Sequence, residues 1–165
     1  MTIELKRLVA SDVDSFRELR MIALKNHPKV YLQVFEEEST RPRNFHVGMI
    51  NDNIIVGAFY DGVLIAYTFL TVMPYTKLKH KGHVWGAYVK PEYRNHSLGK
   101  KMREWLFDEG RRIGLMSCHS SIVASNAATL AMHKAVGYIE MYTEKDGIKH
   151  PDGSYDDLIH LVKYL

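Results

Sequence analysis

The 165-residue chain has few of the features that mark secreted, membrane or nucleic-acid-binding proteins. Cys118 is its single cysteine, so no disulfide can form within the chain and a reducing compartment is favoured. No apolar run is long enough to span a membrane, and the N-terminal segment lacks the apolar core of a secretory signal. The formal net charge of +3 is far from the basic footprint of nucleic-acid binding. We therefore expect a cytoplasmic protein with no membrane or nucleic-acid partner.

The composition is that of an ordinary globular protein, with 46% hydrophobic and 25% charged residues. The length suits one domain over residues 1–165, and no repeat, low-complexity segment or linker divides it. The histidines show no zinc-like spacing with cysteine, and His80 with His83 is a weak signal by itself. We expect no metal site.

Hydrophobic periodicity predicts alternating strands and helices. Asp61-Gly62 between two apolar runs favours a tight hairpin turn, and Pro28 ends the first predicted helix. Residues 29–52 indicate only short helices and loops. The order implies an α/β sheet with helices packed on it. The predicted strands cover residues 3–8, 54–60, 63–72, 83–89, 117–124, 138–145 and 155–164, and the predicted helices cover residues 12–26, 98–113 and 127–136.

The most informative segment is residues 87–100, where an apolar strand stops at Pro91 and a small-residue turn opens a helix. Backbone N–H groups gather at such a helix N-terminus, and the helix dipole favours negative charge there. Gly99 lets a phosphate approach the backbone, and Lys100 adds positive charge. The alternatives are an ordinary strand–loop–helix connection and a nucleotide- or phosphate-binding domain of another kind.

Two segments resemble motifs of the GNAT superfamily of acyl-CoA-dependent N-acetyltransferases. Val89-Lys90-Pro91 followed by Arg94 and Gly99 is similar to motif A, although Ser97 stands where the first glycine is expected. Residues 125–128 with Ala131 and then Gly137-Tyr138 are similar to motif B, in which an asparagine opens a helix that ends in Gly-Phe or Gly-Tyr. Two motifs in the right order are more specific than either alone.

This resemblance implies a mixed, mostly antiparallel sheet of about seven strands, splayed near its middle to admit acyl-CoA and flanked by helices. It implies acetyl-CoA, or coenzyme A, as co-substrate. The alternatives are plain sheet pairing for residues 87–89, and a helix N-cap role for Asn126 that Ser125 could fill instead. The residues that the resemblance assigns to the cofactor are Ala87, Tyr88, Val89, Arg94, Asn95, His96, Ser97, Leu98, Gly99, Lys100 and Asn126.

Two histidines stand where relatives carry acid–base residues. His133 takes the place of a tyrosine that protonates the departing thiolate, and the alternative is a solvent-facing helical histidine. His83 stands where one branch of the family carries a glutamate that deprotonates the amine. Coincidence is the competing explanation, because the chain has nine histidines.

The resemblance implies an N-acetyltransferase that moves an acetyl group directly to a primary amine of a small molecule or peptide in a ternary complex. Glu36, Glu37 and Glu38 could attract a cationic amine, although a charge run is usually a solvated face. The alternative function is a non-catalytic acyl-CoA-binding or sensing module on the same fold, and a homodimer is possible.

Overall fold

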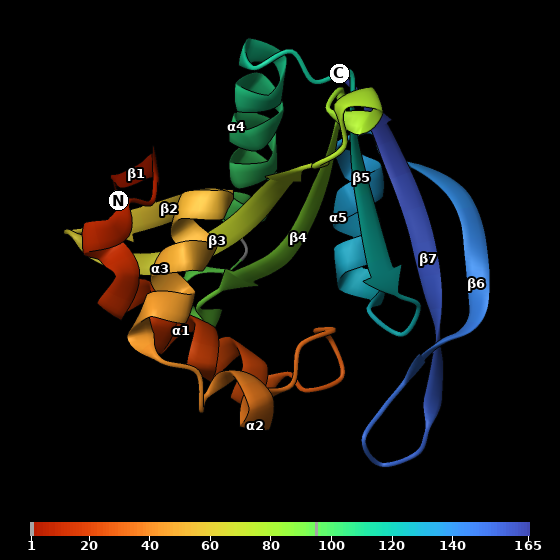
Figure 1. Cartoon of the computed structure of the whole chain (residues 1–165), viewed down its shortest axis with the longest axis horizontal. Helices are drawn as coiled ribbons and strands as arrows, with labels where there is room; N and C mark the ends of the chain where they lie inside the picture. Colours follow the sequence, from red (N-terminus) through yellow and green to blue (C-terminus); the bar gives the residue numbers. More distant parts are fainter. Residues whose placement is uncertain (1, 95) are drawn as a thin grey trace.

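A computed structural model of the chain describes residues 2–94 and 96–165 and contains one seven-stranded sheet (Figure 1). The strands lie in the order β1-β2-β3-β4-β5-β7-β6, and each neighbouring pair is antiparallel except β4 and β5. This arrangement confirms the predicted fold class. The strands are β1 Ile3–Arg7, β2 Ile54–Tyr60, β3 Val63–Val72, β4 Lys81–Val89, β5 Ser117–Val123, β6 Ile139–Lys149 and β7 Tyr155–Tyr164.

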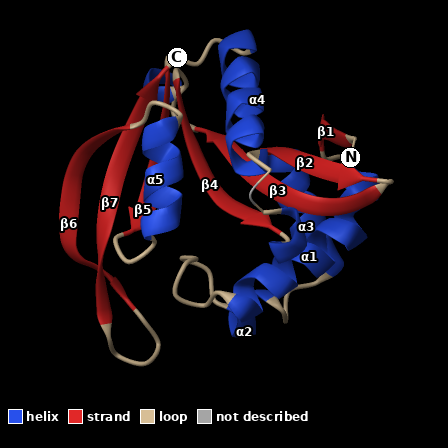
Figure 2. Ribbon diagram, turned by 180° about the vertical axis from the view of Figure 1, so that it is seen from behind, coloured by secondary structure: helices blue, strands red, loops and turns tan. Residues whose placement is uncertain are grey.

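Helices cover both faces of the sheet (Figure 2). On one side α4, Leu98–Arg112, places Met102 and Leu106 in a core with Val56 and Leu70. The helix α5, Ala127–Ala135, packs Leu130 against the same core. On the other side α1, Val13–Asn26, and α3, Arg43–Asp52, bury a second core against β2 and β3. The four-residue helix α2, Phe35–Glu38, lies beside α1.

The hairpin between β2 and β3 forms at the predicted turn. Asp61 and Gly62 have φ values of 48° and 78°. Two successive positive φ values are those of a primed turn, whose twist matches the flanking strands. The prediction of a tight hairpin is therefore confirmed.

The sheet opens between β4 and β5, which pair in parallel over only three positions, the last being His83 with His119. The two strands then diverge (Figure 1). On its other edge β4 has a register irregularity opposite Thr68, where Gly86 adopts a φ of 65°. A bulge of this kind bends a strand and re-aims its backbone, so it contributes to the opening.

Strand β6 extends beyond its predicted end at residue 145. It reaches Lys149 because the register with β7 shifts between Glu144 and Ile148, where Asp146 takes a φ of 52°. Within the described residues, no helix is long and apolar enough to cross a membrane.

Candidate active site

Two cavities meet beside the opening between β4 and β5. The α4 cavity, of about 610 Å³, extends from the N-terminus of α4 along β4. The β4–β5 cavity, of about 420 Å³, is lined by His83, Trp85 and Ser121. A path from one cavity to the other therefore passes the free edge of β4. The residues that line both cavities are Val30, Tyr31, Ala87, Arg103, Asn126 and Thr129.

The N-terminus of α4 has the geometry of an anion site. Ser97, Leu98, Gly99 and Lys100 all line the α4 cavity. Ser97 is the N-cap with φ 55°, and it makes no side-chain capping bond to the first turn. A Cβ added to Gly99 would have no atom within 4 Å other than those of its chain neighbours and its own helix backbone, so the approach to this backbone is open. These residues fit the pyrophosphate of coenzyme A.

The turn before α4 is tied to the end of β4. Arg94 donates from Nε to the carbonyl oxygen of Val89 at 3.0 Å, and it also lines the α4 cavity. This contact holds the turn against the end of β4. His96 is exposed and lines neither cavity, and Asn95 lies outside the described residues.

Residues 87–89 have one paired edge and one open edge. Tyr88 pairs with Tyr67 and Val89 with Ala66 on β3, so the sheet-pairing alternative is true of that edge. Among the described residues, the edge toward β5 has no partner strand beyond His83, and Ala87, Tyr88 and Val89 all line the α4 cavity. Backbone groups on an unpaired edge can bond an extended chain, as a pantetheine arm requires.

Asn126 caps α5 and also lines both cavities. Its Oδ1 accepts from the backbone N–H of Thr129 at 3.2 Å, so the capping alternative is correct. The cap uses only the side-chain oxygen, and the NH₂ group can still donate to a ligand. Ser125 is not the cap, because its hydroxyl donates to Asp156 at 2.6 Å.

His133 is fully buried between α5 and the sheet. Its Nδ1 lies 2.8 Å from the carbonyl oxygen of Thr129, and its Nε2 lies 3.1 Å from the hydroxyl of Ser120. Burial, with the nearby charge of Arg103, lowers the pKa of His133 to about 3. The side chain lines neither cavity, and the solvent-facing alternative is wrong. Proton donation by His133 stays a prediction that the geometry of the cavities does not support.

Replacing His133 with phenylalanine should make stability less sensitive to acid. The folded pKa of about 3 lies below the ordinary value of 6.5, so the unfolded chain binds the extra proton between these values. Stability from the neutral form is present above pH 6.5 and is lost as pH falls toward 3. Urea unfolding at pH 7.5 and 5.0 should show an acid-induced loss smaller by about 2 kcal/mol in the variant.

An equal loss in both proteins would mean that His133 titrates normally in the folded chain. The same variant tests the predicted acid role. A large fall in kcat at unchanged CoA affinity would support proton donation, and a normal kcat would leave a structural role.

His83 lies on the wall of the β4–β5 cavity, beside the end of the β4–β5 pairing. Burial lowers its pKa below 6.5, and the charges of His119 and His160 lower it further. The imidazole is therefore neutral near pH 7 and can accept a proton. The predicted base is on the cavity wall, and its catalytic role stays a prediction.

Sequence reasoning missed a second proton-accepting arrangement, which reaches the same wall through Ser121. The hydroxyl of Ser121 lies 3.0 Å from Nδ1 of His160, whose Nε2 lies 2.9 Å from Oε2 of Glu144. If Nε2 carries the hydrogen toward the carboxylate, Nδ1 accepts from Ser121. The ring of Tyr142 stacks on His160 with centroids 4.4 Å apart. Only the pairing of β5 with β7 and of β7 with β6 brings these residues together, so no local motif announces them.

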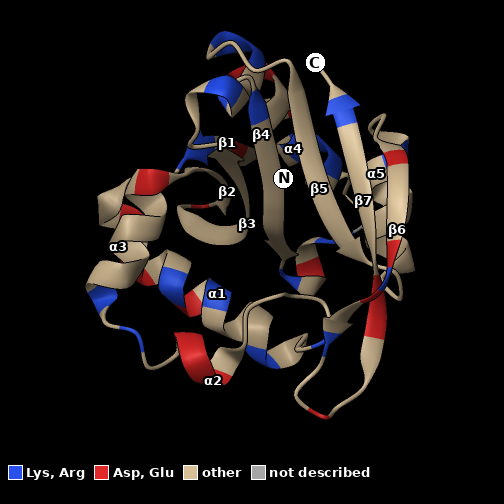
Figure 3. Cartoon of the chain, turned by 45° about the vertical axis from the view of Figure 1, so that its right-hand side comes forward, with Lys and Arg blue, Asp and Glu red and all other residues tan. Residues whose placement is uncertain are grey.

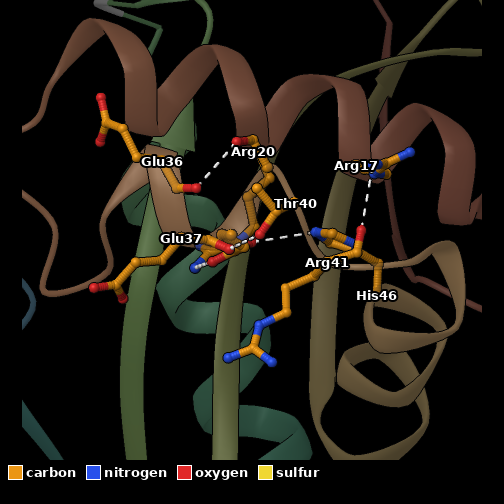
Figure 4. Close-up of polar contacts among 9 residues, drawn as sticks. Arg17, Arg20, Glu36, Glu37, Thr40, Arg41 and His46 are labelled. Atoms are coloured by element: carbon orange, nitrogen blue, oxygen red, sulfur yellow. Dashed lines mark hydrogen bonds and ion pairs between the residues drawn. The ribbon is translucent and has the colours of Figure 1, made fainter.

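The three glutamates of α2 do not line either cavity, so the prediction that they face the acceptor is wrong. Glu38 is buried and accepts from Nε and Nη2 of Arg20 at 2.5 and 2.8 Å. Its Oε1 also lies 3.3 Å from Nε2 of His46. Glu36 and Glu37 are exposed and point away from this cluster (Figure 4). In Figure 3, α2 is an acidic helix at the periphery, below α1.

Arg103 was also missed as a cavity residue. It projects from α4, is only 2% exposed, and donates from Nη1 to Oγ1 of Thr68. It lines both cavities, and no motif in the sequence marks it out. The described residues contain no group of three or more His, Cys, Asp or Glu side chains placed to hold a metal ion.

A model of the acetyltransferase (GNAT) family matches residues 15–138. The chain belongs to this family. A spermidine N(1)-acetyltransferase from Thermoplasma acidophilum is 24% identical over 174 aligned positions and covers 99% of each chain. A ribosomal protein bS18-alanine N-acetyltransferase from Escherichia coli K12 is 31% identical over 71 residues, which are 43% of this chain and 48% of that protein.

The fold is also similar to solved structures of GNAT acetyltransferases. A GNAT-superfamily phosphinothricin acetyltransferase from Sinorhizobium meliloti, crystallised with acetyl-CoA, superimposes with a TM-score of 0.81 at 21% identity. The match covers 100% of this chain and 89% of that one. The seven-stranded sheet and its flanking helices are therefore those of the GNAT fold.

Proposed function

We propose that this acetyltransferase moves the acetyl group of acetyl-CoA to a primary amine of a small molecule or peptide, by direct transfer in a ternary complex. The observation that carries the proposal is the unpaired edge of β4, where the two cavities meet. One cavity begins at the N-terminal end of α4, and the other is lined by Leu32 and Gln33 in the segment between α1 and α2. A donor and an acceptor can thus reach the same strand from two sides.

In this proposal the α4 turn holds the pyrophosphate, and the edge of β4 bonds the pantetheine arm. Holding both substrates in place converts a bimolecular reaction into an effectively unimolecular one. Backbone N–H groups near Ala87 could also stabilise the oxyanion of the tetrahedral intermediate. Tyr31 fixes this part of β4, because its hydroxyl donates to the carbonyl oxygen of Ala87 at 2.8 Å.

An acceptor ammonium must lose a proton before it can attack the thioester. His83 is the group we propose for this step, because it lies on the cavity wall and is neutral near pH 7. The chain of Ser121, His160 and Glu144 is the second candidate. The neutral amine then forms the C–N bond at the thioester carbonyl, and collapse of the tetrahedral intermediate breaks the C–S bond. Of the two protons that leave the nitrogen, one ends on the thiol and one in solvent.

Binding and product analysis together test this proposal. Calorimetry should show that coenzyme A binds more tightly than ATP; tighter ATP binding would favour an unrelated phosphate-binding function. Mass spectrometry on a panel of amines and peptides with acetyl-CoA should then detect an acetylated acceptor. Cofactor binding without any acetylated product would favour the non-catalytic sensing module.

A further inference from the structure

The fold buries two arginines in different ways. Arg20 is fully buried, and its guanidinium forms a two-point contact with the carboxylate of Glu38. Arg103 is equally inaccessible but has no carboxylate within ion-pair distance among the described residues. Nη1 donates to the neutral hydroxyl of Thr68, and Nε has no partner in that part of the chain. The charge of Arg103 is therefore buried without a counterion.

Arg103 lies where this charge can meet a ligand. Its side chain lines both cavities, together with Tyr31, Ala87 and Asn126 at their junction. No aspartate or glutamate of the described chain lines either cavity, whereas Arg94 and Lys100 line the α4 cavity and Arg103 lines both. The junction is thus electropositive, which suits a negatively charged ligand group better than a positively charged ammonium group.

The shape and charge of the guanidinium group indicate which kind of anion Arg103 would bind. A buried charge is costly unless it is paired and its hydrogen bonds are made. Burial also lowers the pKa of Arg103, whereas the pKa of Arg20 is raised with Glu38 as its partner. The planar guanidinium fork matches a carboxylate through two parallel hydrogen bonds. Within the described residues the carboxylate of Glu38 is such a partner for Arg20, and no carboxylate pairs with Arg103.

We propose that Arg103 binds a substrate carboxylate at the junction of the two cavities. This inference rests on the proposed transfer function and deepens it by naming a chemical class of substrate. The carboxylate could belong to the acceptor, as in an amino acid, or to the acyl group, as in a dicarboxylic acyl-CoA. Both present the same anion to the same guanidinium, from opposite cavities.

The test compares Arg103→Met with the wild type on matched substrate pairs. The acceptor pair is an amino acid and its amide, with acetyl-CoA as donor. The donor pair is succinyl-CoA and butyryl-CoA, with an acceptor that lacks a carboxylate. We expect the wild type to favour the carboxylate-bearing member of one pair. The variant should lose at least ~10-fold of that preference in kcat/KM, about 1.4 kcal/mol, while the neutral member is little changed.

The pair that shows the preference identifies the source of the carboxylate. Arg111→Met is the matched control, because Arg111 lies on the same helix with its side chain 51% exposed, and it should change neither ratio. Arg103→Lys keeps the charge but loses the fork, so it should retain part of the preference. If the methionine variant does not fold, the same comparison of substrate preference can be made with the lysine variant.

Two results would overturn the inference. An equal loss for charged and neutral substrates would assign Arg103 to the thioester oxygen that all donors share. Unchanged kcat/KM for all four substrates in a folded variant would make Arg103 a packing residue. If the protein transfers no acyl group, calorimetry with the same pairs in the presence of coenzyme A still measures the preference, so the two proposals fail separately.

Discussion

Replacing His83 with alanine is expected to lower kcat by about 100-fold at pH 7 and to leave CoA affinity nearly unchanged. General acid–base catalysis typically contributes ~10²–10⁴-fold, and this interaction belongs to the transition state. His83 lines the β4–β5 cavity and not the α4 cavity, so the cofactor site should be undisturbed. Steady-state kinetics with saturating acetyl-CoA, together with CoA titration, measure the two effects.

The pH profile gives an independent reading of the same variant. Burial and two neighbouring histidines hold the pKa of His83 below 6.5, so its base form predominates above that pH. The wild-type rate should therefore fall as pH drops below 6.5 and His83 gains a proton. This acidic limb should disappear in the alanine variant, where no imidazole remains to be protonated.

His119→Ala is the matched control, because His119 pairs with His83 on β5 but lines neither cavity. It should retain most of its activity. A normal kcat in His83→Ala, measured where chemistry limits the rate, would contradict the assignment. If Ser121→Ala or His160→Gln loses activity instead, the base is the chain that ends at Glu144.

Replacing Gly99 with valine is expected to weaken CoA binding by about 100-fold, or ~2.7 kcal/mol. A branched side chain at this position would occupy the approach to the α4 N-terminus. Hydrogen bonds to charged groups are worth about 1.5–3 kcal/mol each, so the loss of one or two accounts for the effect. The fold should survive, because the added Cβ would meet nothing within 4 Å. Calorimetry on the folded variant measures the change.

Two further variants serve as controls for Gly99→Val. Gly48→Val places the same side chain on α3, where the nearest neighbour of the new Cβ is Asp52 at 3.9 Å. It should leave CoA affinity alone. Ser97→Gly should also keep the affinity, since the left-handed φ of 55° suits glycine. Unchanged affinity in Gly99→Val would remove the phosphate-binding role from the start of α4.

The sequence was informative where the signals are local. The Asp61-Gly62 turn, the strand that stops before Pro91 and the helix from Leu98 depend on residues close together in the chain. The GNAT resemblance added the splayed sheet, which periodicity alone cannot specify. Those elements place the residues that we propose for the cofactor, so the position of this part of the candidate site in the fold could be predicted.

The rest of the site depends on contacts between distant residues. Glu38 was treated with Glu36 and Glu37 as one surface run, yet Arg20 on α1 draws only Glu38 inside. Arg103 is buried because Thr68, on another element, accepts its hydrogen bond. No local pattern distinguishes these side chains from their exposed neighbours.

The buried position of His133 also could not be predicted from the sequence. The sequence offered a catalytic role or a solvent-facing one, and the side chain is in fact enclosed between α5 and β5. Its partners are the Thr129 carbonyl and the hydroxyl of Ser120 on the sheet. The pairing of β5 with β7 likewise creates the contact between Ser121 and His160 from residues far apart in the chain.

Thiol release from acetyl-CoA, followed with and without each amine of a broad panel, tests the central claim most directly. The account predicts that at least one amine accelerates release, and that one acetylated acceptor appears for each thiol freed. A protein that binds coenzyme A but releases no thiol with any amine or peptide would contradict it and would be a sensing module.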